Sequence, residues 1–285
     1  MFRQMYQEKY MRFPEGKFKA VTFSYDDGVS ADMRLVQIFN KYGLKGTFNL
    51  NNRLFDCQSW HNRMNEEQTY LTFVNGPHEI ALHGARHIFM DKVPLPEAVN
   101  ELVQNRVYLE NKFGRIVRGM AYAYNGYTDN IIKTLPALGV KYARTTDDSH
   151  DFSLPQNFFE WRPTIHHRSP EFPELAKKFL NGEPHRERKH RESWLFYLWG
   201  HSYEFDDDNN WELIENFANS VAADGGIWNA TNIEIYEYIT AYRALVFSID
   251  GERVYNPSAI PVWIELRDKI YKINPAQTLQ FDKEI

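Results

Sequence analysis

Short apolar segments alternate with amphipathic segments along most of this chain, and this alternation constrains the fold more than any other feature. Residues 20–25 and 47–50 are short and apolar, as buried strands are. Residues 96–113 instead carry apolar side chains at helical spacing, with a proline at the start and Gly114 behind the end. Strands that alternate with helices of this length are typical of βα units and a parallel sheet. The pattern therefore predicts an α/β fold whose sheet can close into a barrel.

The remaining elements follow from the same spacing. Further strands are predicted at 78–82, 116–122, 140–145 and 194–199, and further helices at 129–138, 173–180 and 211–223. After residue 245 the character changes, because two strand-like segments, 245–249 and 253–255, flank an Asp-Gly pair, which is a hairpin signal. We expect a single catalytic domain with its barrel core over 17–245 and a small antiparallel β extension over 246–285. The charged segment 184–192 is expected to be a solvated loop, and the segment 161–167 is expected at the rim of the barrel.

Composition narrows the class of protein. The formal net charge of −5 over 285 residues lacks the basic footprint of a nucleic-acid binder, so no nucleic-acid partner is expected. The single cysteine, Cys57, excludes an internal disulfide and a cysteine-rich zinc module. No apolar run is long enough to span a membrane, and the first twenty residues lack the apolar core of a signal peptide. We therefore expect a cytoplasmic protein, and its oligomeric state stays open.

Two adjacent carboxylates, Asp26 and Asp27, follow the first apolar strand and precede Gly28. The carboxyl ends of strands carry the active site in barrels and other parallel α/β folds. A turn at Gly28 lets both carboxylates reach one site, where a metal could neutralise one and leave the other free to act as a base. The alternative is a helix N-cap or a local turn.

Histidines follow two other predicted strands. His83 and His87 are four residues apart, a spacing that places two imidazoles on one face of a helical turn, where they can bind one metal. With a carboxylate from the first cluster they complete a two-histidine, one-carboxylate set. His201 comes directly after the strand 194–199 and is placed to act as an acid or base near neutral pH. Each histidine could instead be a surface or core residue.

These three clusters, in this order, resemble the motifs of the polysaccharide deacetylases of carbohydrate esterase family 4. The family's first motif is matched by residues 22–28 and its second by the pair His83 and His87, whereas the last motif is met only loosely around His201. The likeness runs from about residue 19 to residue 245. It implies a distorted (β/α)7 barrel, a divalent metal, usually zinc, held by Asp27, His83 and His87, with Asp26 as general base and His201 as general acid.

The third motif of the family departs from the pattern in this chain. Aligning Tyr124 with the family tyrosine puts Ala121 where the family has an arginine, and Arg118 lies on the opposite face of the strand. The arginine that steadies the base carboxylate therefore has no clear counterpart. Arg144, at the end of the strand 140–145, is our candidate replacement. A surface ion pair of Arg144 with Asp147 or Asp148 is the alternative.

The resemblance implies hydrolysis of an acetyl group on an N-acetylated sugar or polysaccharide, with an acetylated carbohydrate as substrate. By resemblance the backbone N–H of Tyr124 would stabilise the oxyanion, and Trp199 and Tyr127, together with Arg144, are candidate substrate-binding residues. A first alternative keeps the fold and the metal but takes a non-sugar amide, such as an imide or ureide. A second is a catalytically inactive barrel that only binds carbohydrate.

Overall fold

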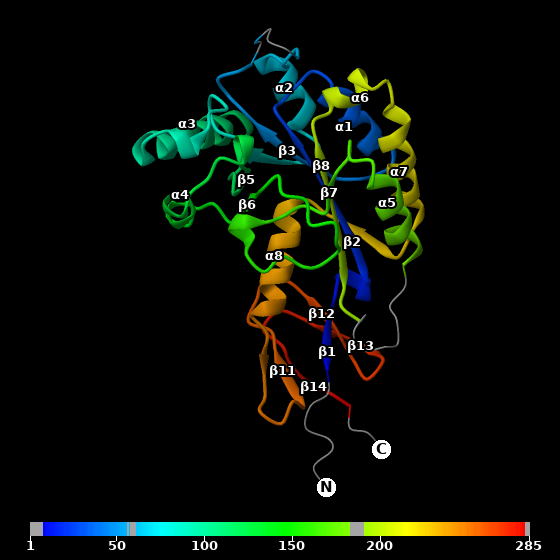
Figure 1. The fold of residues 1–285 in the computed structure, drawn as a ribbon. Coiled ribbons are helices and arrows are strands. Elements are labelled where there is room, and N and C mark those ends of the chain that lie inside the picture. The colour runs from blue at the N-terminus through cyan, green and yellow to red at the C-terminus, as the bar shows by residue number, and fades with distance from the viewer. Residues whose placement is uncertain (1–7, 56, 58–60, 183–190, 283–285) are drawn as a thin grey trace.

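A parallel sheet forms the centre of the molecule (Figure 1). The computed structural model describes residues 8–55, 57, 61–182 and 191–282, and within them the sheet has the strand order β6–β5–β4–β3–β2–β8–β7, with β9 also pairing with β2. The predicted α/β architecture is thereby confirmed. The strands of this sheet are β2 (Lys19–Asp26), β3 (Thr47–Leu50), β4 (Glu79–Leu82), β5 (Gly119–Ala121), β6 (Tyr142–Arg144), β7 (Ile165–His166), β8 (Trp194–Gly200) and β9 (Ile227–Asn229).

The sheet is curled, so that its two outermost strands, β6 and β7, approach each other. Strand β2 lies inside the sheet, because both of its edges pair with neighbouring strands. Strand β8 pairs with β2 from Lys19 to Tyr25, while β3 and β9 pair with opposite halves of β2. At the far side, Trp161 forms a parallel bridge with Arg144 of β6, and four residues later the same segment pairs with β8 as β7. The result is the distorted barrel expected from the sequence. We expected the segment 161–167 at the rim of the barrel, but Trp161 is buried and connects the two outer edges of the curled sheet.

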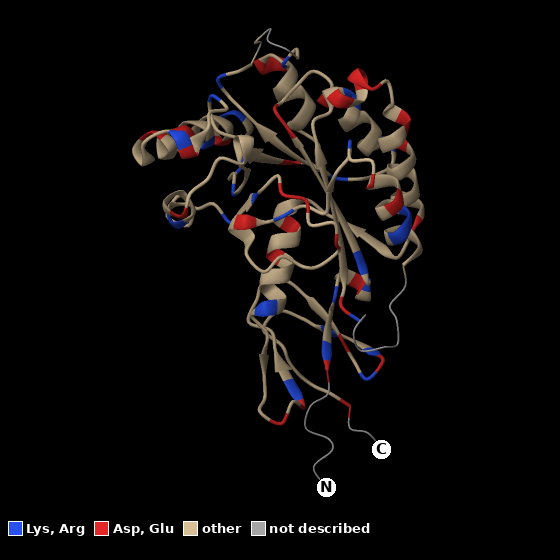
Figure 2. Ribbon diagram, viewed as in Figure 1, with Lys and Arg blue, Asp and Glu red and all other residues tan. Residues whose placement is uncertain are grey.

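Helices surround the outer side of this sheet (Figure 1). Helices α2 and α8 begin with capping boxes, at Asn65 and Thr231, and α3 ends where Gly114 takes a left-handed conformation. Figure 2 shows charges of both signs on outer helices such as α3 and α5. The helices are α1 (Asp32–Lys41), α2 (Glu66–Phe73), α3 (Leu95–Phe113), α4 (Asp129–Thr134), α5 (Phe172–Asn181), α6 (Tyr203–Asp207), α7 (Trp211–Ala223) and α8 (Asn232–Arg243), with 3-10 turns η1 (Pro14–Gly16), η2 (Met90–Lys92), η3 (Ala123–Asn125) and η4 (Phe158–Glu160).

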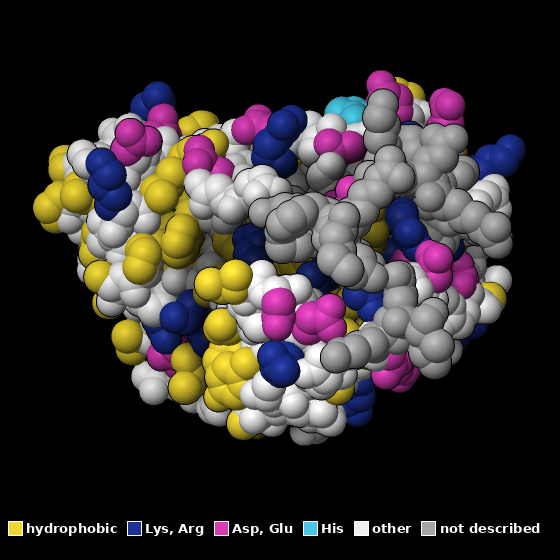
Figure 3. Space-filling model, turned by 90° about the horizontal axis from the view of Figure 1, so that it is seen from below, with side chains coloured by type: hydrophobic (Ala, Val, Ile, Leu, Met, Phe, Trp, Pro, Cys, Tyr) yellow, Lys and Arg dark blue, Asp and Glu magenta, His cyan; other side chains and the backbone are white. Residues whose placement is uncertain are grey.

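Two small antiparallel sheets lie at the end of the molecule where both termini are found (Figure 1). One consists of β10 (Val246–Phe247), β11 (Arg253–Tyr255) and β14 (Thr278–Gln280), and its first two strands are the predicted hairpin. The other consists of β1 (Lys9–Arg12), β12 (Val262–Leu266) and β13 (Lys269–Ile273). The N-terminal strand β1 was not predicted from the sequence. On this end, acidic and basic side chains are interspersed among apolar ones (Figure 3).

Some predicted elements are shorter than expected. The strand predicted from residue 116 begins only at Gly119, because Ile116 lies at the surface with 73% of its area exposed. The helix predicted over 129–138 ends at Thr134 and continues as turns. Residues 184–190 of the charged loop predicted over 184–192 lie outside the described residues. Among the described helices none is both long and apolar enough to cross a membrane.

Candidate active site

A cavity of 360 Å³ opens at the carboxyl ends of the central strands. Its walls come from the ends of β2, β4, β5 and β8, which are parallel and therefore present their carboxyl ends on the same side of the sheet. Seven of the nine predicted site residues line it. The lining residues are Asp26, Asp27, Val29, His61, Arg63, His83, His87, Tyr122, Tyr124, Thr146, Trp199, His201 and Tyr203.

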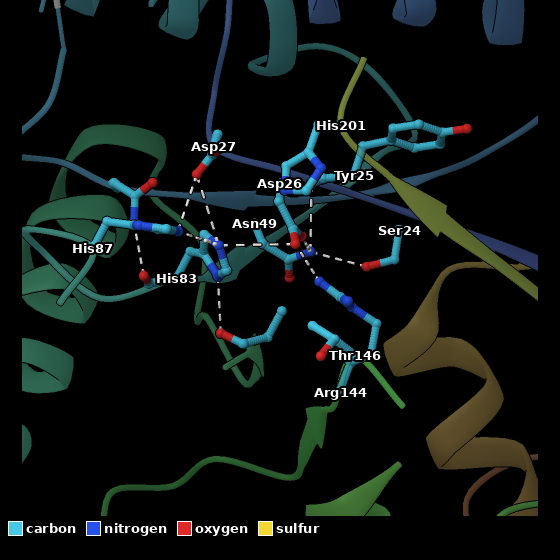
Figure 4. Close-up of polar contacts among 12 residues, drawn as sticks. Ser24, Tyr25, Asp26, Asp27, Asn49, His83, His87, Arg144, Thr146 and His201 are labelled. Atoms are coloured by element: carbon cyan, nitrogen blue, oxygen red, sulfur yellow. Dashed lines mark hydrogen bonds and ion pairs between the residues drawn. The ribbon is translucent and has the colours of Figure 1, made fainter. Parts of the chain in front are cut away.

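The two adjacent carboxylates point in different directions because the chain turns sharply after β2. Asp26 is the last residue of β2, whereas Asp27 and Gly28 both have positive φ, 86° and 68°. Glycine adopts such angles without strain and aspartate tolerates them better than most residues. This turn directs Asp27 toward the histidine pair while Asp26 remains within the barrel (Figure 4).

His83 and His87 converge on Asp27, but they lie in a loop and not on the helical turn that we predicted from their spacing. His83 directly follows β4, and the chain then bends, with positive φ at Gly84 and His87. The His87 Nε2 atom lies 3.3 Å from Asp27 Oδ1, the His83 Nε2 atom lies 3.7 Å from the same oxygen, and the two nitrogens are 3.1 Å apart. The loop conformation thus achieves the convergence that a helical turn would give.

This trio has the chemistry of a metal site. The ligand-capable atoms of Asp27, His83 and His87 lie within 4.8 Å of one another, and Asp27 Oδ1 is buried without a hydrogen-bond partner in the described structure. His83 Nδ1 faces the carbonyl oxygen of Ala121 at 2.9 Å, which fixes the ring proton on Nδ1 and leaves the Nε2 lone pair facing Asp27. These residues fit a divalent metal ion.

Asp26 is held as a carboxylate by partners from two other strands. Arg144 Nη2 forms an ion pair with Asp26 Oδ2, and Asn49 Nδ2 donates a hydrogen bond of 2.8 Å to Asp26 Oδ1 (Figure 4). Burial alone would raise the pKa of Asp26, but the positive charge of Arg144, aided by His83, outweighs it and lowers the pKa to about 2. The carboxylate is therefore ionised at neutral pH.

Arg144 is fully buried in the barrel and does not take the surface ion pair that we considered as the alternative. The Arg144 guanidinium lies 4.3 Å from the ring centroid of Trp199, on the inner side of that ring. There it forms the ion pair with Asp26. Trp199 lines the cavity, and its Nε1 donates a hydrogen bond of 2.7 Å to Asp148. Arg144 thus contacts the carboxylate and is shielded from the cavity in which a substrate would lie.

The two predicted tyrosines occupy different positions. Tyr124 lies at the cavity rim, in a left-handed conformation with φ of 54°, and its ring stacks on Phe89 with 4.0 Å between centroids. More than half of the Tyr124 surface, 54%, is exposed. Tyr127 is not among the cavity-lining residues. Its ring stacks behind Tyr122, at 4.5 Å between centroids.

His201 faces the cavity from the loop after β8 and has a carboxylate behind it. Its Nδ1 atom lies 3.4 Å from Glu204 Oε2, and the same oxygen accepts the His201 backbone N–H at 3.0 Å. Burial lowers the pKa of His201, but Glu204, Asp26 and Asp27 together raise it above its usual value. The arrangement favours a protonated imidazole near neutral pH.

Sequence reasoning missed three polar residues that organise the site. Asn49 is the next-to-last residue of β3 and has a buried amide, and an amide side chain within a buried strand is the signal that could have indicated it. Arg63 lies 3.4 Å from Asp27 Oδ1 and also donates to Asn51 Oδ1 at 3.1 Å. Glu204 lies three residues after His201, in α6, and accepts the His201 backbone N–H. No local pattern marks Arg63 or Glu204.

The arrangement matches known proteins in fold. A protein of the polysaccharide deacetylase type from Mycobacterium smegmatis aligns with a TM-score of 0.59 and 17% identity, covering 84% of this chain and 96% of its own. A family 4 carbohydrate esterase from Streptomyces lividans, solved with acetate, aligns with a TM-score of 0.51 and 11% identity over 75% of this chain and 93% of its own. A family 4 pseudoenzyme from Bacillus anthracis aligns with a TM-score of 0.51 and 14% identity over 80% of this chain and 68% of its own. No curated protein matches the sequence.

The fold is that of the (β/α) barrels of the polysaccharide deacetylase type. The family model described as polysaccharide deacetylase matches residues 8–143, which contain the paired carboxylates and the histidine pair. The match spans slightly less than half of the chain, so this N-terminal part is similar to the polysaccharide deacetylase family.

Proposed function

We propose that this protein hydrolyses the acetyl group of an N-acetylated sugar in a metal-dependent reaction, releasing acetate and a free amine. The observation that carries the proposal is the division between the adjacent carboxylates. Asp27 Oδ1 faces two histidine nitrogens without a hydrogen-bond partner in the described structure, while Asp26 is bound by Arg144 and Asn49. One carboxylate is thus available as a metal ligand and the other as a base.

Asp27, His83 and His87 would hold the metal, for which we propose zinc, because two imidazoles and a carboxylate with open positions suit this ion in catalytic sites. When bound, such an ion polarises an acetyl carbonyl and lowers the pKa of a water molecule. The chain supplies the remaining steps of the reaction.

Asp26 would accept the proton of the attacking water. Its ionised state at neutral pH leaves the carboxylate free to take this proton, and its bonds to Arg144 and Asn49 fix its orientation. The oxygen that becomes negative in the tetrahedral intermediate would accept a hydrogen bond from the backbone N–H of Tyr124, at the cavity rim.

His201 would donate a proton to the departing amine, since an amine anion is too poor a leaving group at neutral pH. The raised pKa of His201 supports this role, because the acid must carry its proton when the C–N bond breaks. The exposed ring of Tyr124, stacked on Phe89, offers an apolar surface beside the site for a sugar ring.

The test is acetate release from a panel of N-acetylglucosamine oligomers and O-acetylated sugars, with added zinc and with a chelator. We expect release that requires the metal and is abolished in the Asp26→Asn variant, whose amide cannot accept the proton. Release that persists in this variant would remove Asp26 as the base. No release from protein shown to hold metal would exclude these sugars and favour a non-sugar amide such as an imide or ureide.

A further inference from the structure

We propose that His166, His201 and Glu204 form a second cation site that takes a divalent transition metal such as zinc. Ligand-capable atoms of His166, His201 and Glu204 all lie within 4.8 Å of one another. None of these residues belongs to the Asp27, His83 and His87 trio described above. The chemical class follows from the donors, because imidazole and carboxylate together suit zinc and its neighbours in the first transition series.

The sheet register brings these residues together. Strands β7 and β8 are parallel neighbours in which His166 lies beside Trp199, and the next residue, His167, donates its backbone N–H to Trp199 O at 2.9 Å. His201 follows two residues after Trp199, and Glu204 lies in α6, where its own N–H bonds back to His201 O at 3.1 Å. The cluster is therefore built on paired strands and one helical turn.

The distances within the cluster suit tetrahedral coordination. Glu204 Oε2 lies 3.2 Å from His166 Nε2, 3.4 Å from His167 Nε2 and 3.4 Å from His201 Nδ1. Ligand bonds of roughly 2.0–2.1 Å to a tetrahedral zinc place the ligand atoms about 3.3 Å from one another. The His166 and His201 nitrogens are thus separated from Glu204 Oε2 by about the edge length of such a tetrahedron.

His167 supplies an independent observation. It is 2% exposed, and within the described part of the chain neither of its ring nitrogens has a hydrogen-bond partner. Its ring is stacked against Tyr25, at 5.6 Å between centroids, and against Phe205, at 4.1 Å. These contacts aim Nε2 at Glu204, so a buried polar atom without a hydrogen bond points into the cluster.

Two further contacts define what a metal must displace. The Arg168 backbone N–H donates to His166 Nδ1 at 3.1 Å, so the ring proton of His166 is on Nε2 and faces Glu204. A metal at Nε2 moves this proton to Nδ1 and breaks the bond to Arg168, which is exposed. The Arg168 guanidinium lies 3.7 Å from the other carboxylate oxygen, Oε1, and leaves Oε2 to the ring nitrogens.

The second site has a consequence that rests on the proposed function. A metal on His201 Nδ1 excludes the second ring proton that His201 needs to act as an acid. Occupancy of this site therefore stops proton donation to the leaving amine, while the first site stays loaded. Excess zinc is expected to inhibit the reaction that one equivalent of zinc supports.

The test is zinc binding measured by equilibrium dialysis of chelator-treated full-length protein against about 50 μM free zinc. We expect two equivalents in the wild type, one in His166→Gln, one in Glu204→Gln and one in Asp27→Asn, which loses the first site instead. His150→Gln is the control, since His150 is half-exposed and pairs with Glu171 outside both clusters. One equivalent in the wild type, or two in either His166→Gln or Glu204→Gln, overturns the proposal.

Activity is a separate readout. Raising zinc from one to two equivalents should lower acetate release at least 10-fold in the wild type and less than 2-fold in His166→Gln, each protein being compared with itself. Binding of two equivalents without this inhibition overturns the inhibitory role alone. Because the zinc stoichiometry is measured without substrate, it tests the second metal site even if the protein does not catalyse the proposed deacetylation.

Discussion

Arg144 and Asp26 form a fully buried ion pair across the barrel, although they are 118 residues apart and three strands lie between β6 and β2 in the sheet. The ion pair stays shielded from water because the Trp199 ring covers the Arg144 guanidinium, with 4.3 Å between the guanidinium and the ring centroid. A buried charge left without its partner is costly, and the positive charge of Arg144 keeps Asp26 ionised.

Replacing Arg144 with glutamine should lower the turnover number on the order of 100-fold, because the base carboxylate loses the charge that orients it and holds its pKa low. Metal content should stay at the wild-type level, since Arg144 contacts none of the three proposed ligands. The measurement is kcat for acetate release together with zinc content. Arg118→Gln is the matched control, because Arg118 pairs with Glu237 at the surface. An Arg144→Gln enzyme with wild-type kcat would remove this role.

Substituting His87 with alanine should weaken zinc binding on the order of 100-fold or more, because one of three protein ligands is lost. Removing the metal with a chelator should abolish acetate release, and added zinc should restore it. The measurement is zinc affinity by competition with a fluorescent chelator. His150→Ala should bind zinc like the wild type, and equal affinity in the two variants would show that His87 is not a ligand.

Asp32 should make folding stability fall as the pH rises. It is completely buried beneath the loop after β8, where Ser202 donates to its Oδ1 at 2.6 Å, and burial raises its pKa from 3.8 to about 8. In the unfolded chain the carboxyl ionises near its ordinary pKa, whereas in the folded protein it keeps its proton. The stabilisation is therefore complete below about pH 4 and is lost as the pH rises through about 8.

Asp32→Asn is the test of this linkage, because the amide keeps the acceptor for Ser202 and cannot ionise. The free energy of unfolding, measured by urea denaturation at pH 5 and pH 8, should fall with pH more steeply in the wild type than in the variant. Parallel pH dependences in the two proteins would contradict the assignment.

Arg12 should contribute strongly to stability, because it ties the small C-terminal sheet to the barrel. Its side chain is 2% exposed, pairs with Glu265 at 2.8 Å, and donates to the carbonyl of Arg191 at 2.9 Å. Arg12→Ala leaves Glu265 with Arg191 as its ion-pair partner but removes the buried hydrogen bonds of Arg12 to the carbonyls of Met11 and Arg191, and should lower the free energy of unfolding by about 2 kcal/mol.

The control for Arg12 is Arg253→Ala, which removes an exposed pair with Asp250 and should change stability by less than about 1 kcal/mol. A single cooperative transition is expected in the wild type, because we propose that residues 17–245 and the C-terminal extension fold as one unit. Two separate transitions, or a small effect of Arg12→Ala, would show that the C-terminal sheet is independent.

Local sequence was sufficient for most of the fold. Apolar runs such as 47–50 and the helical spacing of 211–223 coincide with β3 and α7 because burial of an apolar face is encoded within each segment. Strand ends were less predictable, as at Ile116, because pairing with a neighbour and not the residue's own apolar character decides where a strand begins. The strand β1 was missed for the same reason, since its partner β12 is about 250 residues away.

The sequence by itself also located the paired carboxylates and the three histidines of the candidate site. They lie at the carboxyl ends of β2, β4 and β8, and parallel strands bring their carboxyl ends to one side of a sheet whatever the details of packing. Their chemical roles stay predictions that the experiments above test.

Only the tertiary structure decided which charges face one another inside the barrel. The partnership of Arg144 with Asp26, and the convergence of His166, His167 and His201 on Glu204, depend on how the sheet curls and how β7 pairs with β8. No spacing in the sequence records these contacts, because they join residues whose separation along the chain is set by intervening helices and loops. The physical reason is that a side chain's charge state is fixed by its neighbours in space.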